Sequence, residues 1–199
     1  MDTNITLTFT EPVYAAAGTI TIHHTDTGTV VEAISATGGQ VSGVGTATVT
    51  IDPTGTLTSD TDYHVTVTAG AFQDAAGNPY SGISNPTSLN FTTADTTAPL
   101  LLSTTPADEA TGVAADTNIV LEFSESVFAG TGDITIYYSA DGVVFETIPV
   151  GPPAVYGFGY DIITIDPVGT LDEDTTYYVN IDPGAFTDEA DNPYAGITD

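Results

Sequence analysis

The sequence predicts an all-β protein made of two tandem β-sandwiches, and three observations support this prediction. Apolar and polar residues alternate along short segments, as in strands with one buried face: Ile5, Leu7 and Phe9 alternate with threonines. Turn-forming residues separate these segments, and no stretch has the pattern of a long amphipathic helix. The chain also repeats itself at a constant offset of 114 positions.

The repeat covers nearly the whole chain. The segment DTNITLTFTEPV, which begins at Asp2, matches DTNIVLEFSESV, which begins at Asp116. A longer segment that begins at Thr50 matches one that begins at Thr164, with the same offset and no insertion. Copies of this length with many short strands are typical of tandem sandwiches. Besides the first segment of each copy, the expected strands include residues 20–22, 49–51, 63–67, 134–136, 163–165 and 177–181.

The two copies are out of phase with the predicted sandwiches. Leu89 and Phe91 are expected in the closing strand of the first module, and residues 100–104 in the opening strand of the second. The predicted modules are therefore residues 1–94, without an opening strand, and residues 95–199, without a closing strand. Either the chain is an excerpt from a longer array, or neighbouring subunits complete each other's sheets by strand addition.

The charge balance of the chain is extreme. It has 27 Asp and Glu residues, no Lys or Arg, and a formal net charge of −27. This excludes a basic surface for nucleic acid or for anionic lipids. Hydrophobic residues make up 41% of the chain and follow strand patterns, so we expect a folded protein and not a disordered acidic segment. Cations from brine or from a calcium-rich medium are then needed to offset the self-repulsion.

Cysteine is absent, which excludes disulfides and thiolate metal sites, and the absence of lysine excludes Lys–Asn isopeptide crosslinks. We find no apolar run long enough to span a membrane and no signal peptide, and we expect no direct insertion into a membrane. A small secreted domain without disulfides often depends on a bound metal. The sequence therefore predicts an extracellular module with Ca²⁺ as its cofactor.

Three motifs resemble the bacterial immunoglobulin-like domains of the SbsA (Big_5) type. They are Thr-Pro-Ala-Asp at residues 105–108, Phe-Ser-Glu at 123–125 and Asp-Ala-Ala-Gly-Asn at 74–78. The resemblance covers nearly the whole chain, although the second copy has Asp191 where the first has Gly77. It implies two tandem immunoglobulin-like β-sandwiches that act as a spacer on the bacterial cell surface, in an adhesin or an S-layer protein.

Two acidic loops are the first candidates for calcium sites. Ca²⁺ takes roughly six to eight oxygen ligands, and a carboxylate and an amide four residues apart on a turn can present several of them to one point. The alternative is a plain β-turn in which the Asp and Asn side chains bond to backbone amides. The loop residues are Asp74 and Asn78 in the first copy and Asp188, Glu189, Asp191 and Asn192 in the second.

Further carboxylates are candidate ligands outside these loops. Glu11 and Glu125 each lie two residues after an apolar Phe, so they face the same side of the strand and, without Lys or Arg, require backbone donors or a metal. Each can share a Ca²⁺ ion with the acidic loop of its own copy, or be a solvated edge residue. At the junction of the modules, Asp95, Asp108 and Asp116 can bind Ca²⁺ that stiffens the array, or belong to a solvated linker.

No residue pattern predicts an enzyme. The chain has no Gly-x-Ser-x-Gly motif, and no motif singles out a catalytic pair of carboxylates. The three histidines occupy positions where the second copy has tyrosines, which indicates aromatic packing and not acid–base chemistry. His23, His24 and His64 correspond in this way to Tyr137, Tyr138 and Tyr178.

Three functions remain after these exclusions. The first is an extracellular spacer repeat whose partners are the neighbouring modules of the same chain. The second is a subunit of a self-assembling filament, completed by strands from identical subunits. The third is a glycan- or ice-binding module that uses threonine-rich strand faces. The aromatic segment at residues 155–160 has two interpretations. It is either a docking surface for a neighbour or for carbohydrate, or a hairpin packed on its own sheet.

Overall fold

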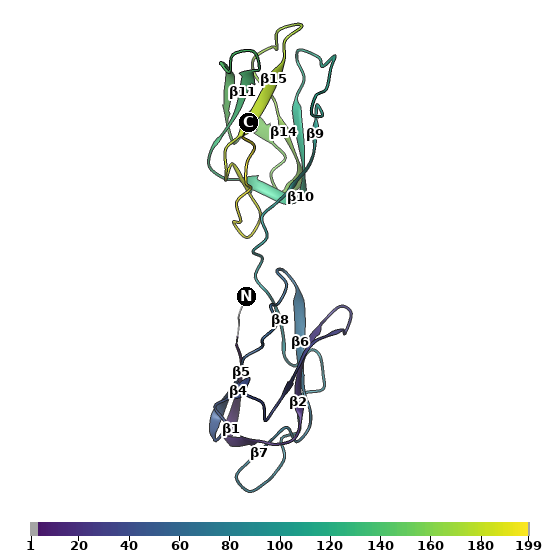
Figure 1. The fold of residues 1–199 in the computed structure, drawn as a ribbon, viewed down its shortest axis with the longest axis vertical. Coiled ribbons are helices and arrows are strands. Elements are labelled where there is room, and N and C mark those ends of the chain that lie inside the picture. The colour runs from purple at the N-terminus through teal and green to yellow at the C-terminus, as the bar shows by residue number, and fades with distance from the viewer. Residues whose placement is uncertain (1–3, 199) are drawn as a thin grey trace. The chain divides into compact units, whose positions relative to one another are not determined.

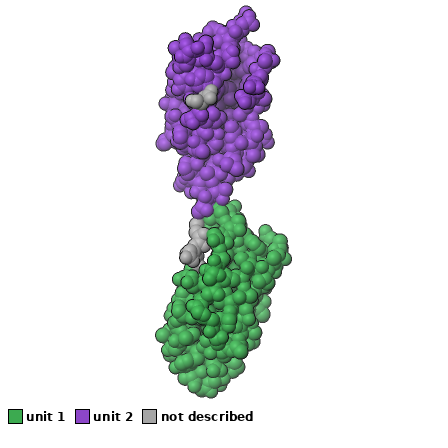
Figure 2. Space-filling model, viewed as in Figure 1, with its two compact units in different colours: residues 1–95 green, residues 96–199 purple. Residues whose placement is uncertain are grey.

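The computed structural model of the chain describes residues 4–198 and contains strands, turns and loops in that range (Figure 1). The chain divides into two compact units, residues 1–95 and residues 96–199 (Figure 2). None of the described residues belongs to a helix that is long and apolar enough to cross a membrane. The prediction of an all-β protein with two tandem sandwiches is confirmed.

Unit 1 is a sandwich of two four-stranded sheets, ordered β4-β5-β1-β7 and β3-β2-β6-β8. Alternate residues of both sheets point inward and form one core, which includes Ile20, Val49 and Tyr63. The strands are β1 (Ile5–Ala15), β2 (Thr19–His24), β3 (Val30–Ser35), β4 (Val41–Ser42), β5 (Thr46–Ile51), β6 (Asp62–Val67), β7 (Phe72–Gln73) and β8 (Asn90–Thr92).

Unit 2 repeats this design with a different set of edge strands. One sheet has the order β13-β14-β10-β16, with β9 also paired to β10, and the other has the order β12-β11-β15. Its core includes Leu121, Ile134 and Ile163. The strands are β9 (Leu101–Thr105), β10 (Ile119–Ala129), β11 (Asp133–Tyr138), β12 (Val144–Pro149), β13 (Val155–Tyr156), β14 (Tyr160–Ile165), β15 (Tyr177–Ile181) and β16 (Phe186–Thr187).

The two units differ at β8 and β9, which form where the sequence predicts a closing and an opening strand. In unit 2, β9 pairs with β10, with Thr105 opposite Val120. Within residues 4–198, the matching part of β1 pairs with β5 and has no counterpart of β9. In unit 1, β8 pairs with β6. The strand of unit 2 that matches β6 is β15. Among the named strands of the described residues, β15 pairs with β11 alone.

One tyrosine has the same role at the start of β6 and of β15. The hydroxyl of Tyr63 accepts a hydrogen bond from the backbone N–H of Thr58 at 2.9 Å, and that of Tyr177 accepts one from Asp172 at 2.8 Å. A tyrosine that bonds back to the chain a few residues upstream is typical of immunoglobulin-like sandwiches. This contact ties the preceding loop to the sandwich in both units.

Candidate functional site

The acidic loop of unit 2 folds around Asp188, which follows β16. Its Oδ1 accepts the backbone N–H groups of Ala190 at 2.9 Å and Asn192 at 2.8 Å, and its Oδ2 accepts the side-chain amide of Asn192 at 2.7 Å. Asp188 is only 2% exposed. The loop therefore holds a buried carboxylate in a fixed orientation.

The loop of unit 1 repeats these hydrogen bonds around Asp74. Oδ1 accepts the N–H groups of Ala76 and Asn78, both at 2.8 Å, and Oδ2 accepts the Asn78 side-chain amide at 2.6 Å. The side-chain bond from Asn78, followed by the backbone bonds, holds the pKa of the Asp74 carboxyl below its ordinary value. In both loops the Asp and Asn side chains bond to one another, as in the β-turn alternative that the sequence left open.

The exchange of Gly77 for Asp191 falls at a special backbone position. Both residues have a positive φ, 85° for Gly77 and 65° for Asp191. Glycine adopts this conformation without steric cost, and Asp is among the few other residues that tolerate it. The second copy therefore keeps the shape of the turn and adds an exposed carboxylate.

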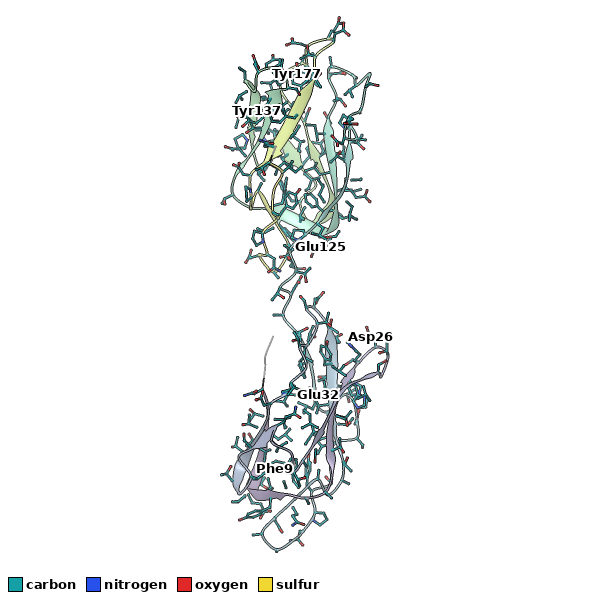
Figure 3. All side chains as sticks on the ribbon, viewed as in Figure 1. Phe9, Asp26, Glu32, Glu125, Tyr137 and Tyr177 are labelled. Carbon is teal, nitrogen blue, oxygen red and sulfur yellow. The ribbon has the colours of Figure 1, made fainter. Side chains whose placement is uncertain are left out.

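Two of the predicted ligands form one group in unit 2. A carboxylate oxygen of Glu125 lies within 4.8 Å of one of Asp188. Asp95, the last residue of unit 1, accepts a hydrogen bond from Ser59 Oγ at 3.0 Å. Glu125 lies on β10 (Figure 3), in the stretch where the pairing with β14 shifts register. Two carboxylates about 4 Å apart repel each other by about 1 kcal/mol in water and about 4 kcal/mol near a protein surface. A cation bound among them removes this cost.

The chain just before β9 lies beside this group in unit 2. Just before β9, the backbone of Leu100 donates to Ser124 Oγ at 2.9 Å and accepts from Ser124 N at 2.8 Å, next to Glu125. In unit 2 the chain is thus held against this end of β10. In unit 1 the corresponding Glu11 is exposed and Asp74 is only half-buried.

The remaining predicted ligands lie apart from this group. Asp108, Asp116, Glu189 and Asp191 are exposed, each on a turn or loop, and none of them joins the group. The amides of Asn78 and Asn192 act inside their own loops, as described above. The structure thus brings together one ligand from β10 and one from the acidic loop of unit 2.

Sequence reasoning missed Glu32 on β3, whose side chain is shown in Figure 3. Its carboxylate accepts hydrogen bonds from Gln40 Nε2 at 2.7 Å, from Thr54 N at 3.1 Å, from Thr54 Oγ1 at 2.8 Å and from Gly55 N at 3.1 Å. Desolvation acts to raise the pKa of Glu32, but these hydrogen bonds outweigh it and hold the pKa below its ordinary value.

The second copy has the same feature at Glu146. It accepts the N–H groups of Val168 at 3.0 Å and Gly169 at 2.9 Å. The recurrence of a glutamate at one strand position of both copies was a signal that pointed to this role. In a chain without Lys or Arg, backbone amides are the donors that fix a carboxylate in place.

The histidines stack as the aligned tyrosines do. The rings of His23 and His64 are 4.7 Å apart and nearly parallel, and those of Tyr137 and Tyr178 are 4.8 Å apart and nearly parallel (Figure 3 labels Tyr137). His64 is 8% exposed. Desolvation, and then the neighbouring charge of His23, lowers the pKa of His64. The histidine pair therefore joins β2 to β6 by ring packing, and the tyrosine pair joins β11 to β15 in the same way.

Comparison with known proteins agrees with this architecture. The model of the bacterial Ig-like domain matches residues 1–93 and again residues 95–199, so the second match begins at Asp95. The comparison with curated proteins found no match. Ig-like domains of this family typically occur as repeats of extracellular surface proteins, and the fold is typically structural and not catalytic. Two sandwiches and two family matches that together span the chain show that it belongs to the bacterial Ig-like domain family, with two tandem domains.

Proposed function

We propose that the chain is a calcium-stabilised structural repeat of a bacterial surface protein, either an adhesin or an S-layer protein. The family supports the structural role, because its domains are typical of extracellular surface repeats. The close approach of the Glu125 and Asp188 carboxylates in unit 2 supports the role of calcium.

The chemistry of this group fits a hard divalent cation. Carboxylate oxygens are preferred ligands of Ca²⁺, and an oxygen that accepts an N–H bond keeps lone pairs for a metal. Asp188 is buried, and a second carboxylate, that of Glu125, lies close to it. Sites in extracellular modules bind Ca²⁺ with dissociation constants of about 0.1–1 mM. A site of this affinity is occupied in a medium that contains millimolar Ca²⁺.

Calorimetric titration and thermal melting test this proposal. At millimolar Ca²⁺ we expect the melting temperature of unit 2 to rise, because an ion that binds only the folded state stabilises it by mass action. Mg²⁺ or NaCl at the same ionic strength is expected to give a smaller rise. Glu125→Gln should abolish the calcium-specific part, whereas the matched control Glu11→Gln should not. An equal response to all salts, or a normal calcium response in Glu125→Gln, would contradict the calcium site.

A surface location is part of the same proposal. In cells that produce the full-length parent protein, antibodies against the chain should label intact cells, and external protease should remove the label. Labelling that requires cell lysis would contradict the surface role, whatever the outcome of the calcium titration.

A further inference from the structure

The outer face of one sheet differs in chemistry between the two copies. In unit 1 the exposed positions of β4 and β5 carry hydroxyl side chains. In unit 2 the matching positions of β13 and β14 carry aromatic or aliphatic side chains, although the strand pairing is the same: Thr8 faces Thr48 in unit 1, and Glu122 faces Ile162 in unit 2. The replaced residues are Ser42, Thr46 and Thr48, which correspond to Tyr156, Tyr160 and Ile162.

These three side chains are exposed to solvent. Tyr156 is 47%, Tyr160 69% and Ile162 50% exposed, so they contribute little to the core of unit 2. The inward neighbours Ile163 and Ile165 are fully buried and hold the strand in place. Burial therefore does not explain the apolar side chains on this face, and contiguous exposed apolar patches often mark binding sites.

The side chain of Tyr156 reaches across the sheet. Its hydroxyl accepts a hydrogen bond from the side-chain amide of Asn118 at 3.3 Å. Tyr156 lies on β13 and Asn118 immediately precedes β10, and β14 lies between these two strands. The side chain must therefore extend over β14. An exposed aromatic ring anchored at its hydroxyl offers a surface for stacking.

The apolar positions form a strip along β14. Tyr156 lies opposite Thr164, and Ile162 and Tyr160 follow on the same face of the strand at intervals of two residues. At about 3.3 Å per residue, the strip from Thr164 to Tyr160 is about 13 Å long. This length accommodates several consecutive sugar rings.

Hydrogen-bonding groups border the strip. Glu122 lies on β10 directly opposite Ile162 and accepts a hydrogen bond from Ser103 Oγ at 2.6 Å. A carboxylate beside an exposed ring is complementary to a sugar, which has an apolar C–H face and hydroxyl donors at its edge.

We propose that this face of unit 2, defined by Tyr156, Tyr160, Ile162 and Glu122, binds a neutral polysaccharide. The negative charge of the chain favours a neutral polysaccharide over an anionic one. With a net charge of −27 and no Lys or Arg, the chain repels anionic polysaccharides and other copies of itself. Stacking on rings and hydrogen bonding to carboxylates require no cationic group. This role is independent of the calcium site, and repetition of such faces in an array multiplies a weak single-site affinity.

Affinity electrophoresis of the whole chain tests this proposal. The probes are neutral polysaccharides (hydroxyethylcellulose, xyloglucan, galactomannan and dextran), with alginate as the anionic control. We expect at least one neutral polymer, but not alginate, to retard the chain. The double variant Tyr156→Ser/Tyr160→Thr carries the residues of unit 1 at these positions and should weaken this retardation at least 10-fold. Tyr14→Ala, at a tyrosine of unit 1 that is 45% exposed, is the matched control and should behave as the unmodified chain.

Three results would overturn the proposal. They are the absence of retardation by all four neutral polymers, an unchanged retardation of the double variant, and an equal loss in Tyr14→Ala. Sedimentation analysis adds a fourth: a dimer of the chain that the double variant dissociates would assign the face to a second copy. The far-ultraviolet circular dichroism of each variant should match that of the unmodified chain, because the substituted side chains lie outside the core.

Discussion

At the scale of single residues, the two copies show how burial changes the role of one carboxylate. Asp74 and Asp188 accept the same hydrogen bonds in the same loop. Only Asp188 is buried and has Glu125 beside it. The pattern of loop residues is therefore the same in both copies, whereas the environment of the carboxylate differs.

The first prediction concerns these two aspartates. Asp188→Ala should destabilise unit 2 by about 1–3 kcal/mol in a buffer with Ca²⁺, because the N–H groups of Ala190 and Asn192 lose an acceptor that is buried in the loop. Asp74→Ala should destabilise unit 1 less, because water replaces the lost acceptor in a more exposed loop. Chemical denaturation, followed by signals specific to each unit, measures both losses. Equal losses would show that burial does not decide the effect.

The second prediction concerns pH and His64. Its pKa is lowered in the folded state, so the unfolded chain takes up the proton first as the pH falls. Unit 1 should therefore keep its full stability above about pH 6.5, the unfolded value, and lose stability as the pH falls toward the folded pKa. His64→Tyr, the residue of the second copy, should flatten this dependence. The melting temperature of unit 1 between pH 8 and pH 5 is the measurement, and unit 2, which has no histidine, is the internal control.

At the scale of elements, a carboxylate on one strand organises the loop that follows another. Glu32 on β3 receives hydrogen bonds from Thr54 and Gly55, which follow β5. Glu146 on β12 does the same for Val168 and Gly169 after β14. Acidic side chains thus fix loops to strands in a chain that cannot use ion pairs with Lys or Arg.

The third prediction follows from this contact. Glu32→Ala should increase the amide hydrogen-exchange rates of Thr54 and Gly55, because both N–H groups lose their acceptor. The change in global stability should be small, about 1 kcal/mol, because the loop is exposed to solvent. Glu32→Gln keeps one acceptor oxygen and should give an intermediate exchange rate. Unchanged exchange in Glu32→Ala would show that the loop is held by other contacts.

At the scale of the whole molecule, the net charge sets the response to salt. Every carboxylate adds repulsion that the folded state concentrates, and dissolved ions screen it. The screening length falls from about 30 Å at 0.01 M to about 3 Å at 1 M salt. Each unit has its own hydrophobic core, so each responds as a separate folding unit.

The fourth prediction separates screening from binding. Raising NaCl from 0.01 M to 1 M should raise the melting temperatures of both units. Millimolar Ca²⁺ in 1 M NaCl, where screening is nearly complete, should raise the melting temperature of unit 2 further and leave unit 1 unchanged. Differential scanning calorimetry measures both effects. A further rise in both units would place calcium sites outside the carboxylate group near Asp188.

The sequence by itself determined the fold class, the repeat and the charge. Alternation along strands such as Ile5–Phe9 reflects local chain geometry, and the offset of 114 positions shows the two copies directly. It also predicted the strands that became β8 and β9. These features depend on neighbouring residues or on composition, so no three-dimensional information is needed to recognise them.

Only the tertiary structure decided which of the acidic residues meet. Glu125 and Asp188 are far apart in the sequence, and their approach depends on the register shift in β10 and on the chain held beside Ser124. The contacts of Glu32 and of the Tyr156 hydroxyl likewise depend on strands that pair across the sheet. Acidic residues occur throughout the chain, so their number gives no hint of position. Packing alone selects the few that share a site.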